Sequence, residues 1–274
     1  MKKNTMKNIT LLFLAFISIA VSGQKIKPGF YYGQSYYIGE LNDYHFHTRP
    51  HLENFEKSSF GAAIKFQPLL CSEVKFSFMY GYVSGDDSIA EINPERGLHF
   101  KSKMLETSLQ VQLSLPFDYT EKFFNWEEKI FRLTPYVFTG ISYFSFNPMG
   151  QYTDGKWYEL QPLSTEGQEL VPTRDKYKLS GVAIPFGIGF KVITYQNVEL
   201  EAEWGIRYTF TDYLDDVSTS YYDNDLLRNS KGDMAAYFAD PAGANSPNDK
   251  RGDSTTKDKY IFAGFTVYYT FEFP

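Results

Sequence analysis

Strict alternation between apolar and polar residues over positions 198–211 constrains this chain more than any other feature. One row is apolar or aromatic and the other holds three glutamates and an arginine: Val198, Leu200, Ala202, Trp204, Ile206, Tyr208 and Phe210 against Glu199, Glu201, Glu203, Gly205, Arg207, Thr209 and Thr211. A period of two is that of a β-strand. Such contrast between the two faces is typical of a wall between lipid and the polar lumen of a transmembrane barrel.

Seven further segments are alternating or rich in aromatic residues. We expect strands over residues 29–41, 60–67, 74–82, 104–115, 132–146, 182–191 and 260–273. The connections between the eight strands run long, short, long, medium, long, short, long. Outer-membrane barrels have short periplasmic turns and long outer loops, and an even strand count leaves both termini in the periplasm. The sequence therefore predicts an all-β, eight-stranded antiparallel outer-membrane β-barrel with long extracellular loops, short periplasmic turns and both termini periplasmic.

The first 23 residues have the organisation of a secretory signal peptide. Lys2, Lys3 and Lys7 precede an apolar run over residues 9–21, and small residues follow at Ser22 and Gly23. The run is shorter than the roughly 20 residues that a spanning helix needs. We expect a cleaved signal peptide over residues 1–23 and a single barrel domain over residues 24–274.

Composition agrees with a barrel and excludes some partners. The chain has 22 Tyr and 25 Phe, yet its mean hydropathy is negative, as expected where the lipid face is hidden inside alternation. The formal charge is -6 and becomes -9 without the three lysines of the signal peptide. Such a chain is a poor partner for nucleic acid, and we expect outer-membrane lipid to surround it.

An eight-stranded barrel has an interior that side chains can fill. Charged residues at lumen-facing positions are therefore expected to form a packed polar core and not a pore. These residues are Lys65, Lys75, Glu106, Lys191, Glu199, Glu201, Glu203 and Arg207.

The sequence offers no clear catalytic, cofactor or metal site. No histidine follows His99, and no Ser/His/acid spacing stands out. His45, His47 and His51 are close together, but without cysteines and with few carboxylates we expect solvated loop histidines. Gly187 and Gly189 lie inside an alternating strand, so we expect them to make room for larger neighbours and not to cradle a phosphate. The tripeptide at 251–253 (RGD) matches an integrin-type motif that often arises by chance.

An acidic run, Asp212, Asp215 and Asp216, follows the strand at 198–211. Its spacing does not match a calcium loop of the D-x-D-x-D-G type. Aspartates of this kind commonly cap turns, so our hypothesis is that these three order the long last loop. Calcium binding by these aspartates, with Asp223 and Asp225 further on, is the less favoured alternative.

The medium connection at 116–129 mixes aromatic and charged residues. Its aromatic members are Phe117, Tyr119, Phe123, Phe124 and Trp126. Exposed aromatics among charges are typical of partner contacts, and equally of the interfacial aromatic belt of a membrane protein. We treat this turn as a candidate partner-docking site.

Several segments resemble the PorG family of Bacteroidota. They are residues 36–42 (YYIGELN), 84–87 (SGDD), 160–168 (LQPLSTEGQ), 209–221 (TFTDYLDDVSTSY) and 251–252 with 257–258, followed by the final aromatic strand. Members of that family are outer-membrane components of the type IX secretion system. The resemblance implies a non-enzymatic barrel associated with a periplasmic ring of the PorK lipoprotein and PorN. It supplies no catalytic residues.

Three functions are thus open from the sequence. The first is a structural component of type IX protein secretion. The second is a small outer-membrane barrel with ligand- or host-binding extracellular loops. The third is an outer-membrane enzyme acting on lipid or peptide, which the lack of a catalytic spacing disfavours.

Overall fold

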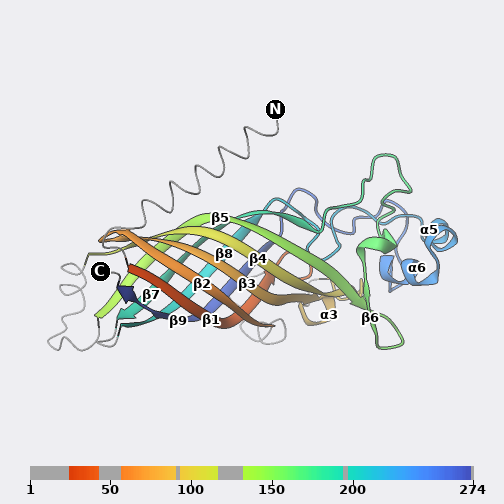
Figure 1. Cartoon of the computed structure of the whole chain (residues 1–274). Helices are drawn as coiled ribbons and strands as arrows, with labels where there is room; N and C mark the ends of the chain where they lie inside the picture. Colours follow the sequence, from red (N-terminus) through yellow and green to blue (C-terminus); the bar gives the residue numbers. More distant parts are fainter. Residues whose placement is uncertain (1–24, 43–56, 91–92, 117–131, 194–196, 273–274) are drawn as a thin grey trace, which may run out of the picture.

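The computed structural model describes residues 25–42, 57–90, 93–116, 132–193 and 197–272. Eight long strands form one closed antiparallel barrel (Figure 1). In chain order they are β1 (Lys25–Ile38), β2 (Lys57–Leu69), β3 (Ser72–Asp86), β4 (His99–Ser114), β5 (Arg132–Gln151), β7 (Ser180–Ile193), β8 (Val198–Thr209) and β9 (Lys259–Tyr269). Pairing of β1 with β9 closes the barrel, and the two-residue β10 (Phe271–Glu272) adds to the same edge of β1. The predicted fold is confirmed.

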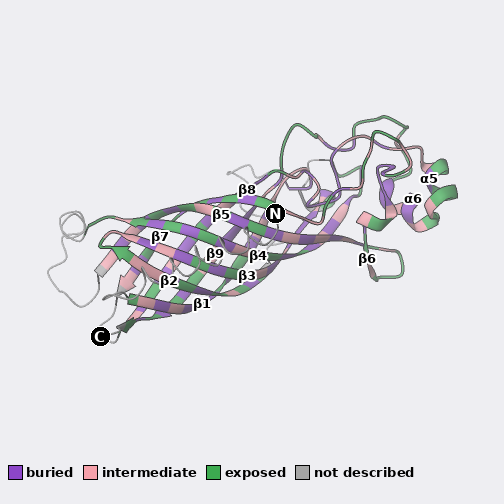
Figure 2. Cartoon of the chain, turned by 45° about the horizontal axis from the view of Figure 1, so that its top comes forward, coloured by how far each residue is buried: buried purple, intermediate pink, exposed green. Residues whose placement is uncertain are grey.

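Burial alternates along every barrel strand, as Figure 2 shows. Outward-facing side chains are apolar or aromatic and largely uncovered; Phe30 is 79% exposed and Phe265 is 68% exposed. Inward-facing side chains such as Lys65 and Arg207 are buried. Because an apolar exterior around a polar interior reverses the usual order of a soluble protein, this is the arrangement of a transmembrane barrel. None of the helices in the described part of the chain is long and apolar enough to cross a membrane.

The two ends of the barrel differ. At one, the short-turn end, residues 70–71 join β2 to β3. The backbones of β1 and β10 are also paired there, with Lys25 opposite Glu272. The unpaired Cys71 lies in this turn. At the other, the long-loop end, the connections carry α3 (Asp87–Ala90), β6 (Trp157–Glu159), the 3-10 helix η2 (Gln161–Leu163), α5 (Asn224–Lys231) and α6 (Asp233–Ala239). The expected alternation of short and long connections is confirmed, and Figure 1 shows the long connections gathered beyond one rim.

Some expected boundaries were wrong. β3 continues to Asp86, which pairs with His99, whereas the sequence predicted a strand that ends at residue 82. β5 continues to Gln151, because β6 pairs with its end outside the barrel. The long last loop of the prediction, between β8 and β9, contains the helices α5 and α6. Asp223 begins α5 as its N-cap, accepting from the backbone N–H of Leu226 at 2.9 Å.

Two glycines of β7 make room for aromatic rings in the lumen. Gly189 pairs with Tyr136 and Gly187 with Phe138 across β5 and β7. A Cβ on Gly189 would lie 2.3 Å from Cζ of Tyr136, and one on Gly187 would lie 2.5 Å from Cζ of Phe138. The expected role of these glycines is confirmed. The predicted signal peptide at 1–23 lies outside the described residues.

Candidate functional site

A buried network of ion pairs fills the half of the lumen nearest the short-turn end. Lys27 Nζ lies 2.6 Å from Glu73 Oε1 and 2.6 Å from Glu199 Oε2. Lys191 Nζ lies 2.8 Å from Glu73 Oε2. Lys65 contacts Glu199 and lies 2.5 Å from Glu201 Oε1. Although Glu73, Glu199 and Glu201 come close enough together to suggest a metal site, three ammonium groups already neutralise these carboxylates.

A second layer continues toward the middle of the barrel. Lys75 pairs with Glu203, and Arg207 Nε lies 3.2 Å from Glu106 Oε2. Tyr260 donates to the same Glu106 oxygen at 2.6 Å. In the described part of the chain, five buried cations thus face five buried carboxylates in the lumen: Lys27, Lys65, Lys75, Lys191 and Arg207 with Glu73, Glu106, Glu199, Glu201 and Glu203. Because the cations and the carboxylates are equal in number, this set of ten side chains, which we call the plug, carries no net charge.

All eight residues predicted to fill the lumen do so. The prediction missed Lys27 and Glu73, which lie just outside the expected strands. Lys27 shares the lumen-facing parity of Tyr31 and Tyr37, and Glu73 that of Lys75. Continuing the alternation by one residue pair toward the short-turn end would have found both.

The long-loop end is closed by a second buried polar cluster, which we call the cap. Its members are Thr165, Glu166, Tyr177, Asp212, Tyr213, Asp215, Asp216, Ser218, Thr219 and Arg251. Its centre is the guanidinium of Arg251, 2% exposed. Nη1 donates to Glu166 Oε1 at 3.1 Å and to the backbone oxygen of Asp216 at 2.5 Å. Nε donates to the carbonyl oxygen of Ala239 at 3.2 Å, near the carboxyl end of α6, where cations are favoured. One side chain thus joins α6, the acidic run and the β5–β7 connection.

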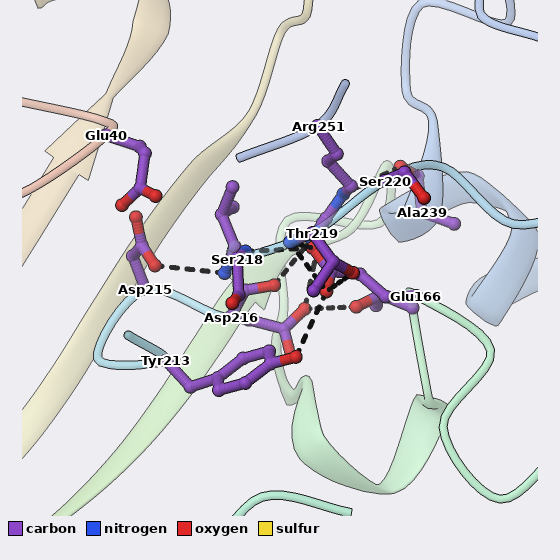
Figure 3. Close-up of polar contacts among 12 residues, drawn as sticks. Glu40, Glu166, Tyr213, Asp215, Asp216, Ser218, Thr219, Ser220, Ala239 and Arg251 are labelled. Atoms are coloured by element: carbon purple, nitrogen blue, oxygen red, sulfur yellow. Dashed lines mark hydrogen bonds and ion pairs between the residues drawn. The ribbon is translucent and has the colours of Figure 1, made fainter. Parts of the chain in front are cut away.

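Glu166 fixes the segment that follows the acidic run (Figure 3). Its carboxylate accepts from the backbone N–H groups of Ser218 at 2.9 Å and Thr219 at 3.1 Å, and from Thr219 Oγ1 at 2.7 Å. Tyr213 OH donates to it at 3.3 Å. Charge-assisted bonds of this kind are stronger than neutral ones, so the β5–β7 and β8–β9 connections are held as one body.

The three aspartates of the acidic run are buried, not solvated. Asp216 accepts from Thr165 Oγ1 at 2.5 Å and from Tyr177 OH at 2.6 Å. Asp215 Oδ1 accepts from the N–H of Val217 at 2.9 Å, a turn-capping contact. Asp212 Oδ2 accepts from Ser218 Oγ at 2.8 Å. Only Asp215 therefore makes the local contact that capping implies, and whether the three order the last loop stays a prediction.

Burial controls the protonation of the cap carboxyls. It raises the pKa of Asp212 to about 6 and that of Asp216 to about 6, even though Arg251 opposes the shift at Asp216. Burial also raises the pKa of Glu40 to about 7. The pKa values of Asp215 and Asp258 are raised well above the ordinary value by burial first and then by neighbouring carboxylates. The ionised forms are therefore disfavoured here.

The arginine and the glycine of the RGD tripeptide are buried in the cap, so the tripeptide as a whole is not an exposed recognition motif. Its arginine is buried in the contacts described above. A Cβ on Gly252 would lie 2.7 Å from the backbone nitrogen of Ser218, so the glycine allows two chain segments to approach closely. The motif match has a structural explanation.

A cleft of about 510 Å³ opens at the long-loop end beside the cap. Arg96 lies in its wall and is itself anchored, with Nη2 2.6 Å from Asp87 Oδ1. Glu40 also lines the cleft, and three lysines are part of the lining: Lys250, Lys257 and Lys259. This cleft was not predicted from the sequence, because its lining comes from three connections that are far apart in the chain and from the strand ends beside them.

A profile of the family described as "Domain of unknown function (DUF6089)" matches residues 6–236. The chain belongs to the DUF6089 family. The match includes β1 to β8 and the acidic run, and it ends before Arg251 and β9. No curated protein matches the sequence.

Solved structures resemble this DUF6089 protein in fold. The N-terminal β-barrel domain of Pseudomonas aeruginosa OprF shares 12% identity, covering 91% of this chain and 98% of that chain, with a TM-score of 0.38. Ail, the attachment invasion locus protein of Yersinia pestis, shares 10% identity over 91% and 99%, with a TM-score of 0.39. Neisserial surface protein A shares 9% identity over 91% and 98%, with a TM-score of 0.40.

Two candidate sites of this DUF6089 protein lie outside the described residues. One is the group His45, His47 and His51. The other is the candidate docking turn with Phe117, Tyr119, Phe123, Phe124 and Trp126. Sequence reasoning missed the contact between Arg251 and Glu166 at the centre of the cap. Arg251 was noted only as part of the RGD tripeptide, and Glu166 carries no motif of its own.

Proposed function

We propose that this protein is a non-enzymatic outer-membrane barrel that acts as a structural and interaction component through its two ends. A neutral plug of five cations and five carboxylates occupies the lumen. Buried ion pairs are costly to break, so the lumen is a poor route for solutes. A barrel of this kind contributes surfaces and not a channel.

More specifically, we propose a role in type IX protein secretion. One observation carries this proposal: four segments that resemble the PorG family, far apart in the sequence, meet in the cap. Glu40 belongs to the first, Glu166 to the third and Asp216 to the fourth, while Arg251 belongs to the last. Arg251 contacts Glu166 and Asp216 directly, and Asp253 donates its N–H to Glu40 at 2.9 Å. The resemblance therefore concerns one packed unit and not scattered matches.

The partners implied by this role are PorK-like lipoproteins and PorN-like ring proteins of the periplasm. We propose that the short-turn end faces the periplasm with both termini, and that the connection at 116–129 docks to the ring. In this orientation the cap lies on the extracellular side of the membrane, where it closes the outer end of the barrel. Outer-membrane lipid surrounds the apolar exterior.

The test is an affinity pull-down of the tagged protein from gently solubilised native outer membranes. We expect PorK-like and PorN-like proteins to co-purify. Replacement of residues 116–129 by a short Gly/Ser turn should abolish their recovery while the barrel remains folded. Leu226→Ser is the matched control, because Leu226 is exposed on α5 at the opposite end of the molecule. Equal recovery with the shortened turn would refute the docking site.

A second candidate function is ligand or host binding by the long loops, which the cleft beside the cap favours. It offers about 510 Å³ of space with several basic side chains. Recovery of the barrel alone in the pull-down, together with normal secretion in a deletion strain, would favour this function over the first.

A further inference from the structure

Three carboxylates from distant parts of the chain converge where the cap meets the barrel rim. Glu40 follows β1, Asp215 belongs to the acidic run and Asp258 precedes β9. One oxygen from each lies within 4.8 Å of the others. Figure 3 shows the carboxylates of Glu40 and Asp215 pointing toward each other.

Backbone N–H groups fix the outer oxygen of each carboxylate. Leu214 donates to Asp258 Oδ2 at 2.8 Å, Val217 to Asp215 Oδ1 and Asp253 to Glu40 Oε1. The second oxygen of each aspartate faces inward, where Tyr37 OH lies 2.6 Å from Asp215 Oδ2 and 3.0 Å from Asp258 Oδ1. A phenol has one proton and can donate to only one of these acceptors at a time. The interior of the cluster is therefore short of positive charge.

Nearby cations are engaged elsewhere. Arg96 pairs with Asp87 and reaches Glu40 only at its backbone oxygen. Lys257 Nζ donates to the carbonyl oxygen of Ser254 at 2.7 Å. Among the described residues, no salt bridge includes Glu40, Asp215 or Asp258. Asp215 and Asp258 are buried, and buried carboxylates without a counter-charge are costly, in contrast to the neutral plug of the lumen.

Asp212, in the same acidic run as Asp215, is a further buried carboxylate. This residue is 2% exposed, and its Oδ1 has no hydrogen-bond partner in the described part of the chain. Its charge is among the causes that raise the pKa of both Glu40 and Asp258. Buried polar atoms are rarely left without a partner, and an ion is one explanation for such an atom.

We propose that Glu40, Asp215 and Asp258 bind a calcium ion, with Asp212 completing the carboxylate set. Calcium takes six to eight oxygen ligands at about 2.3–2.6 Å, so ligand oxygens around one ion can lie up to about 5 Å apart, as these do. All the donors are hard oxygens, which suit calcium and not zinc or copper. The cleft lined by Glu40 gives the ion a route in. This site goes beyond the proposed secretion role and does not depend on it.

Terbium luminescence tests the proposal on the full-length barrel in detergent micelles. Tb³⁺ occupies calcium sites and emits when a nearby tyrosine is excited, and Tyr37 contacts two of the proposed ligands. We expect saturable emission that excess Ca²⁺ displaces. Asp258→Asn should weaken Ca²⁺ binding at least tenfold, and Glu40→Gln, at the edge of the cleft, should weaken it without disturbing the interior. Asp225→Asn is the matched control, since its side chain is exposed on α5 and pairs only with Arg228 among the described residues.

Tyr37→Phe separates the site from the many other tyrosines. It should lose most of the Tb³⁺ emission but retain Ca²⁺ binding in a calorimetric titration. Emission that does not saturate, or that Asp258→Asn and Glu40→Gln leave unchanged, would overturn the proposal and leave shared protons as the means by which the cluster is neutralised. Because this experiment uses only the purified barrel, its outcome is separate from that of the pull-down.

Discussion

Arg251 donates from Nη1 to Glu166 Oε1 at 3.1 Å, although 85 positions separate the two residues in the chain. Both side chains are buried, and the same guanidinium holds backbone oxygens of Asp216, Phe238 and Ala239. Removal of the charge leaves a buried carboxylate unpaired, which costs about 3–5 kcal/mol. These contacts are not part of the strand pairing of the barrel. We therefore expect the loss of stability to be confined to the cap.

We accordingly predict that Arg251→Met loosens the cap without unfolding the barrel. Amide hydrogen exchange should accelerate by two orders of magnitude or more over residues 160–170 and 213–221, because a local opening becomes easier by several kcal/mol. Exchange in β3 and β4 should not change. Lys250→Met is the control, because the Lys250 side chain is 70% exposed. Similar exchange in the two variants would show that Arg251 does not hold the cap.

In the lumen, Lys65 is the counter-charge shared by the most carboxylates. Lys65→Met should lower the free energy of unfolding by about 3–5 kcal/mol, because Glu201 loses its ammonium partner and Glu199 keeps only Lys27. Urea unfolding in micelles measures this loss. Ile64→Ala, one residue earlier on the lipid face, is the comparison and should cost less in micelles.

Adding Glu201→Gln to Lys65→Met should recover part of the lost stability, because the double variant restores the balance of charge. A recovery below about 0.5 kcal/mol would mean that the two residues are not coupled.

Tyr177 links the β5–β7 connection to the acidic run by a ring stack and a hydrogen bond. Tyr177 stacks on Tyr213, with ring centroids 4.4 Å apart and planes within 7°, and its hydroxyl donates to Asp216. Tyr177→Phe keeps the stack and loses the hydrogen bond, so it should destabilise the cap by about 1–3 kcal/mol. Tyr177→Ala loses both and should cost about 3–5 kcal/mol. Limited proteolysis of the β8–β9 connection measures the difference, and equal rates for the two variants would argue against a role for the ring.

The barrel and the lumen could be predicted because the period of two carries their information. Each residue from Val198 to Thr209 is assigned to lipid or lumen by parity alone. Because the eight-stranded barrel is closed, charged side chains that point inward can only lie in the lumen. Lys27 and Glu73 were missed only because the predicted strands began a few residues too late in the sequence.

The cap could not be predicted in the same way. Irregular chain has no period, so nothing in the sequence says that Glu166 and Arg251 meet, or that Glu40 lies beside Asp215. These contacts depend on how connections fold back over one rim. The aspartates were predicted only to cap turns. Acidic side chains are usually exposed, and the burial of these three is explained only by partners from other connections.

The fit between β5 and β7 leads to the last prediction. Gly189→Ala should destabilise the barrel by about 1–3 kcal/mol, because the new methyl group would overlap the Tyr136 ring and approach the backbone oxygen of Ala202. Tyr136→Leu in the same chain should recover part of the loss by making room, although it also removes the contact of Tyr136 OH with Glu203. Ile188→Ala, between the two glycines on the lipid face, is the control for a simple change of strand propensity. If urea unfolding showed the double variant to be no more stable than Gly189→Ala alone, the ring would not be the obstacle, and the close approach to the Ala202 backbone would account for the glycine.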